Sequence, residues 1–156
     1  MEMFVDFLIY TVLALSVQNG LFTRMLGLGE ALELSKTPKY LLPFSLTLGA
    51  QMVLVFVLAG GVLALGPVLQ SIVYLRVLVY ILSMTGVYAA FVGLRRVEFF
   101  SFLKRVSTRL MALAMFNSTV LGALLLTGTF KMSFLRSLGF GLGSAAGFLI
   151  AVFIVL

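Results

Sequence analysis

The sequence predicts an all-α integral membrane protein with about five transmembrane helices. Three observations lead to this fold class. Of the 156 residues, 62% are hydrophobic and only 10% are charged, whereas soluble domains carry about 25% charged residues. Long uncharged runs recur along the chain, and each bilayer crossing needs about 20 apolar residues. Polar amides also stand inside two of these runs, where other protein groups must satisfy them.

The uncharged runs place the helices in one transmembrane domain that covers residues 1–156. The run from Tyr40 to Leu75 is too long for a single crossing. Gly66-Pro67 divides it, because proline lacks an N–H and fits the first turn of a new helix. Five helices are therefore predicted, at about residues 3–24, 40–65, 68–94, 109–128 and 133–156.

The charges predict the orientation. Basic residues concentrate in two links, 24–39 and 95–109, and the positive-inside rule places such links in the cytoplasm. The N-terminus then lies outside, which suits the acidic Glu2 and Asp6. Residues 95–108 have an apolar and a basic face, which fits either an amphipathic helix in the membrane interface or a plain basic loop.

The missing residue types exclude most chemistry. The chain has no Cys and no His, so it lacks thiolate ligands, thiol nucleophiles and the usual neutral-pH general base. We therefore expect no catalytic residue and no metal site in this chain alone. Because the basic residues flank apolar runs, we expect membrane lipid rather than nucleic acid as their partner.

Asn19 and Asn117 stand in equivalent places of the first and fourth predicted helices. A similar apolar tripeptide (LAL and MAL) precedes each of them, and the two helices are expected to cross in opposite directions. This pattern indicates an inverted-repeat bundle in which helices one and four are broken. For these amides, and for Ser118 and Thr119, two interpretations stay open: hydrogen bonds between helices, or an ion path at the breaks.

Glycines recur every four residues in the fifth predicted helix, at Gly139, Gly143 and Gly147. Such a face lets another helix approach closely. We expect it to serve helix packing, within the bundle or against a partner subunit.

Short motifs, in order along the chain, resemble the small multi-helix membrane subunits of the Rnf and Nqr redox-driven ion pumps. VQN, RMLGL and LSK, within residues 17–36, resemble the family's V-N-N, K-F-L-G-L-C-P and V-S-K. IVYLR (72–76) is similar to I-Y-L-R, and NSTVLG (117–122) is similar to T-N-C-A-V-L-G. SLGFGLGSAAGF (137–148) resembles the family's glycine-rich fifth helix, and the set looks closest to the RnfA/NqrE type.

The resemblance implies a subunit of an ion-translocating electron transport complex in a bacterial or archaeal cytoplasmic membrane. It also implies pairing with a homologous membrane subunit of inverted orientation. Such pairs hold iron between broken helices, on cysteines from both chains. Electrons pass between flavin and iron–sulfur partner subunits, and their transfer is coupled to movement of Na⁺ or H⁺.

The chain departs from the family pattern at the iron ligands. The two family cysteines fall on Gly29 and Ser118, and the proline after the first falls on Glu30. Glycine offers no ligand, and a serine hydroxyl replaces a thiolate poorly. We therefore expect no iron site on this chain alone, and any iron, iron–sulfur or flavin group would belong to partner subunits. The family continues through a basic loop into a sixth helix, which we expect this chain to lack, either as a truncated or partly represented subunit or as a diverged paralogue.

Three functions fit these observations. The chain is a scaffold or ion-path subunit of an Rnf/Nqr-type complex, not catalytic by itself; or a diverged structural or assembly protein of the same fold; or a small standalone ion transporter or channel. Loss of both cysteines favours the second, whereas the two asparagines fit all three. Co-purifying partners and iron content would separate them.

Overall fold

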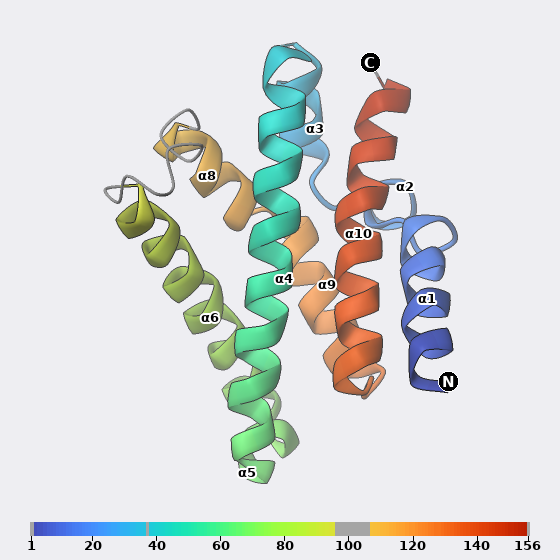
Figure 1. Cartoon of the computed structure of the whole chain (residues 1–156), viewed down its shortest axis with the longest axis vertical. Helices are drawn as coiled ribbons and strands as arrows, with labels where there is room; N and C mark the ends of the chain where they lie inside the picture. The colour runs from blue at the N-terminus through green and yellow to red at the C-terminus, as the bar shows by residue number, and fades with distance from the viewer. Residues whose placement is uncertain (1, 37, 96–106, 156) are drawn as a thin grey trace.

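A computed structural model of the chain describes residues 2–36, 38–95 and 107–155. Regular structure in these ranges is entirely helical. In chain order the elements are α1 (Glu2–Leu15), α2 (Gly20–Arg24), α3 (Leu28–Ser35), the short 3₁₀ helix η1 (Pro38–Tyr40), α4 (Leu41–Leu65), α5 (Pro67–Ser71), α6 (Val73–Leu94), α8 (Thr108–Met115), α9 (Ser118–Thr129) and α10 (Phe134–Val155) (Figure 1).

Within the described residues, four helical stretches are long and apolar enough to cross a bilayer: Leu41–Leu65, Val73–Leu94, Thr108–Thr129 and Phe134–Ile154. The third of these contains both α8 and α9. A shorter apolar helix, Phe4–Leu15, adds a fifth candidate crossing. The predicted all-α membrane fold with about five crossings is confirmed.

The structure differs from the sequence prediction in two connecting segments. The link between the first two crossings contains α3, whose Leu34 is buried in the core. The third crossing is not one helix from residue 68, because Ile72 is extended (φ −95°, ψ 114°) and separates α5 from α6. The predicted interfacial segment at 95–108 lies largely outside the described residues.

Helix α10 stands at the centre of the bundle and packs against α1, α4 and α9, while α4 also contacts α6 and α8. The two broken crossings run in opposite directions along the long axis of the molecule (Figure 1). α1 leads from the end that carries the N-terminus towards α2 and α3. The pair α8–α9 leads back towards that end, so the chain has the antiparallel arrangement of an inverted repeat.

The contact between α1 and α10 depends on the three glycines Gly139, Gly143 and Gly147. A Cβ added at Gly143 would collide with the carbonyl oxygen of Thr11, and one at Gly147 would lie 3.0 Å from that of Leu15. A Cβ at Gly139 likewise meets the backbone of α1. The missing side chains therefore let two helix backbones approach closely, as small residues do between membrane helices.

Replacing Gly143 with alanine is expected to lower the free energy of unfolding by about 2 kcal/mol, because the new methyl group must displace the α1 backbone. Gly93→Ala is the matched control, since a Cβ at Gly93 meets no atom of the described residues within 4 Å. The control should leave stability unchanged or raise it slightly, given the higher helix propensity of alanine. Unfolding in mixed detergent micelles, followed by circular dichroism, measures both. Equal stability of the two variants would contradict the close α1–α10 contact.

An ion pair joins α1 and α10 near the N-terminal end of the bundle. Two guanidinium nitrogens of Arg136, Nη2 and Nε, donate to Asp6 Oδ2 at 2.8 and 3.0 Å. The Arg136 guanidinium also lies 5.6 Å from the centre of the Tyr10 ring. Two hydrogen bonds to one carboxylate oxygen fix the register of the two helices at this end.

Candidate functional site at the broken helices

Asn19 marks the break between α1 and α2. Its Oδ1 accepts a hydrogen bond from the Leu21 N–H at 3.1 Å, so the side chain caps the new helix. Its Nδ2 donates to the carbonyl of Gly147 in α10 at 2.7 Å and to that of Leu15 at 3.2 Å. The side chain is buried. Asn19 therefore starts α2 and also fastens the break to α10.

Asn117 occupies the same place in the second broken crossing, between α8 and α9. Its Oδ1 accepts a hydrogen bond from the Thr119 N–H at 2.8 Å, which caps α9. The residue is completely buried. Its Nδ2, unlike that of Asn19, has no hydrogen-bond partner among the described residues. Such a buried unpaired donor is costly, so the cap of α9 is formed at the expense of an unsatisfied amide.

The turn after α2 lies directly on the start of α9. The Gly27 N–H donates to Ser118 Oγ at 2.7 Å, and Thr119 Oγ1 donates to the Leu26 carbonyl at 3.1 Å. Gly27 adopts φ 77°, a conformation that favours glycine. A Cβ there would approach Asn117 Oδ1 to 2.8 Å. The turn after α2 thus contacts the break between α8 and α9, and the two halves of the inverted repeat meet there.

The positions that match the two family cysteines lie close together in this junction. Gly29 is two residues beyond Gly27 in the first turn of α3, and Ser118 is the residue that Gly27 contacts. Both Gly29 and Ser118 are exposed. Glu30 and Ser118 also line a cavity of about 330 Å³ beside α6. The chain therefore presents these positions on an outer face at the junction.

The residues at this face do not fit an iron ion. Gly29 has no ligand atom, and Ser118 Oγ already accepts the Gly27 N–H. Across the described ranges, no group of three or more His, Cys, Asp and Glu side chains could hold a metal. Iron sites in proteins of this kind depend on thiolate or imidazole ligands, and the sequence contains neither.

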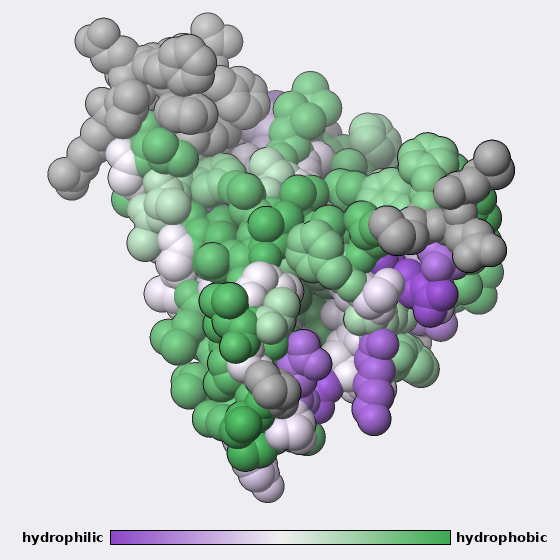
Figure 2. Space-filling model, turned by 60° about the horizontal axis from the view of Figure 1, so that its bottom comes forward, coloured by the Kyte–Doolittle hydropathy of each residue, from purple (hydrophilic) through white to green (hydrophobic). Residues whose placement is uncertain are grey.

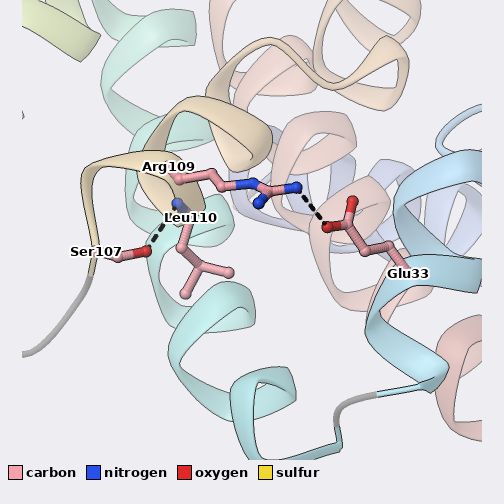
Figure 3. Close-up of polar contacts among 4 residues, drawn as sticks. All are labelled: Glu33, Ser107, Arg109 and Leu110. Carbon is pink, nitrogen blue, oxygen red and sulfur yellow. Dashed lines mark hydrogen bonds and ion pairs between the residues drawn. The ribbon is translucent and has the colours of Figure 1, made fainter.

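A surface ion pair connects the segment that carries Gly29 to the second broken crossing. Glu33 of α3 and Arg109 of α8 lie 3.1 Å apart between Oε1 and Nη2 (Figure 3). In the same view, Ser107 Oγ accepts the Leu110 N–H at 3.1 Å and caps the start of α8. Helix α8 is thus held at its own start and against α3.

Gln51, a fully buried amide in α4, was not among the site residues predicted from the sequence. Its Nε2 lies 3.4 Å from the Met111 carbonyl in α8, and its Oε1 has no partner in the described part of the chain. The available signal was a polar amide within the uncharged run from Tyr40 to Leu75, the same kind of signal that identified the two asparagines.

The four residues proposed as an ion path all lie at the two breaks, and most of their polar atoms are occupied. Asn19 bonds to backbone groups of its own crossing and of α10, whereas Asn117, Ser118 and Thr119 gather around the turn at Gly27. Gly139, Gly143 and Gly147 lie apart from the junction's outer face, against α1.

These features define a class, a membrane protein of several crossings built on two broken helices of opposite direction, in which the turn after α2 lies on the break between α8 and α9. A family model described as Rnf-Nqr subunit, membrane protein, matches residues 7–156. The chain belongs to this family, as its motifs indicated. It is thus a membrane subunit of an Rnf/Nqr-type complex. No curated protein and no solved structure matches it.

Proposed function

We propose that this subunit acts as a scaffold that binds a homologous, inverted membrane subunit through the face carrying Gly29 and Ser118, and that it supplies no iron ligand there. The observation that carries the proposal is the 2.7 Å hydrogen bond from the Gly27 N–H to Ser118 Oγ. It brings both family ligand positions to one exposed face. That face carries no thiolate, because the sequence has no cysteine. The junction that presents the face is nevertheless formed.

The buried bonds of the junction support a structural role. Asn19 and Asn117 each cap a half-helix with a side-chain oxygen, and the caps fix the breaks without any bound group. In this proposal, flavin and iron–sulfur groups reside in partner subunits, and the complex moves Na⁺ or H⁺. The basic links lie in the cytoplasm and the N-terminus outside, following the positive-inside rule.

A second candidate role is a share in the ion path. The unpartnered Gln51 Oε1 supports it, because a buried carbonyl oxygen is a suitable ligand for a cation or an ordered water. Gln51 contacts α8, which leads into the break at Asn117. The scaffold role is preferred, because Asn19, Ser118 and Thr119 all bond to the protein itself and Asn117 does so through its Oδ1.

The scaffold role predicts that the lost ligands can be restored. The double variant Gly29→Cys/Ser118→Cys should raise the iron that purifies with the complex, because it returns thiolates to the junction face. Gly29 accepts the new side chain, since in the described part of the chain a Cβ there meets no atom within 4 Å. Iron per subunit is measured by elemental analysis after purification in mild detergent, together with identification of the co-purifying chains.

The control is Gly93→Cys/Ser118→Cys, which also carries two thiols but only one at the junction face. It should bind no more iron than the unmodified subunit. Iron in stoichiometric amount with the unmodified subunit would contradict the proposal that Gly29 and Ser118 leave this chain without an iron site. Purification of the chain without any membrane partner would contradict the scaffold role itself.

A further inference from the structure

A second cavity, of about 640 Å³, lies far from the broken-helix junction. It is formed by α4, α5, α6, α9 and α10 at the end of the bundle where α5 and the N-terminus lie (Figure 1). This end comes forward in Figure 2, where hydrophilic patches stand among hydrophobic side chains. Neither the junction face nor the proposed scaffold role involves this cavity.

The charged side chains lining the cavity are both basic. Arg76 belongs to the first turn of α6, and Lys131 follows α9. No Asp or Glu is among the described lining residues. Arg76 Nη1 donates to the Gly128 carbonyl at 2.5 Å, which holds the guanidinium at the carboxyl end of α9. The cavity therefore carries uncompensated positive charge.

The backbone of Lys131 adds a second observation. The Lys131 N–H donates to the Gly128 carbonyl at 3.3 Å, and the Met132 N–H donates to that of Thr127 at 3.0 Å. This pair of bonds forms a Schellman motif at the end of α9, in which the left-handed position is usually glycine. Here Lys131 takes that position with φ 47°. The motif fixes the backbone of Lys131 at the end of α9, beside the cavity.

The remaining walls are largely apolar. Leu63, Ala64 and Phe134 line the cavity with apolar surface that the protein does not fully cover. Basic groups at one end of apolar helices, next to an apolar cavity, suit a molecule with an anionic head and a hydrocarbon tail. A water-soluble anion would leave these apolar walls without a partner.

We propose that this cavity binds the phosphate of an anionic membrane lipid, held by Arg76 and Lys131, with the acyl chains against Leu63, Ala64 and Phe134. The phosphate is the group that the two cations recognise. The apolar walls distinguish a lipid phosphate from free phosphate. A lipid bound here would stabilise the packing of α5 and α6 against the ends of α9 and α10.

The test compares lipids on the full chain in mild detergent, by native mass spectrometry. Phosphatidylglycerol should bind at least about fivefold more tightly than phosphatidylcholine, since a basic residue near an anionic headgroup contributes on this scale. Arg76→Gln/Lys131→Gly should lose the preference. Glycine suits the left-handed position, so Lys131→Gly alone should fold at least as well as the native chain and already reduce the preference.

The matched control is Lys36→Gln/Lys39→Gln, which removes the same charge from exposed residues between α3 and α4, at the end of the bundle opposite to α5. It should keep the preference for phosphatidylglycerol. Equal binding of the two lipids, or a preference that survives in Arg76→Gln/Lys131→Gly, would overturn the proposal. Inorganic phosphate that displaces phosphatidylglycerol at matching concentration would assign the cavity to a soluble anion instead.

Discussion

Gly27→Ala is expected to lower the free energy of unfolding by about 3 kcal/mol, the sum of two separate effects. Alanine at φ 77° costs about 1–2 kcal/mol. Its methyl group would also lie 2.5 Å from Phe148 and from Thr119 Oγ1, and such overpacking costs about 1–3 kcal/mol. Gly27 lies in the contact between the turn after α2 and the start of α9. The lower stability of the variant should therefore also reduce assembly with partner subunits.

Gly29→Ala provides the matched control, two residues further along the same turn. A Cβ at Gly29 meets no atom within 4 Å, and its φ is not in the left-handed region. Stability should therefore stay unchanged. Unfolding in mixed micelles, followed by circular dichroism, measures both variants. If Gly27→Ala were as stable as Gly29→Ala, the contact between the two breaks would not exist as described.

Asn19→Leu is expected to lower the free energy of unfolding by about 2–3 kcal/mol. It removes the cap of α2, the bond that the Leu21 N–H donates to Asn19 Oδ1, at a cost of about 0.5–2 kcal/mol. It also removes the bond from Asn19 Nδ2 to the Gly147 carbonyl, at a further cost of about 0.5–1.5 kcal/mol. The same unfolding measurement applies.

Serine substitutions distinguish the roles of the two asparagine side chains. Asn19→Ser keeps a capping oxygen but loses the bond to Gly147, whereas Asn117→Ser keeps its cap and loses only an amide that has no partner among the described residues. Asn19→Ser should therefore cost more. The opposite order would contradict the assigned bonds. Loss of ion flux with full stability in Asn117→Ser would instead favour the ion-path role.

The helices and their breaks could be predicted because each follows from a local pattern in the sequence. Uncharged runs set the crossings, and asparagine in an apolar run identified both breaks, since an amide there needs backbone partners. The spacing of Gly139, Gly143 and Gly147 predicted a close contact but not its partner. That partner is α1, which lies far away in the chain.

The junction itself could not be predicted, because it depends on contacts between residues about 90 positions apart. No local pattern shows that the Gly27 N–H reaches Ser118 Oγ. Helix α3 was also missed, since its short segment between Arg24 and Lys39 carries mixed charges and resembled a loop. The bond between Arg76 and the Gly128 carbonyl could not be predicted either, because it depends on packing of α6 against α9.

The absence of native cysteine allows the most direct measurement of the scaffold role. A single Gly29→Cys variant, labelled with a photoreactive maleimide and irradiated in the membrane, places a cross-linker on the junction face. Gly93→Cys, exposed near the end of α6, serves as the control. We predict that position 29 cross-links to a homologous membrane subunit and that position 93 does not. Cross-linking to that subunit from position 93 alone would contradict the junction face as the binding surface.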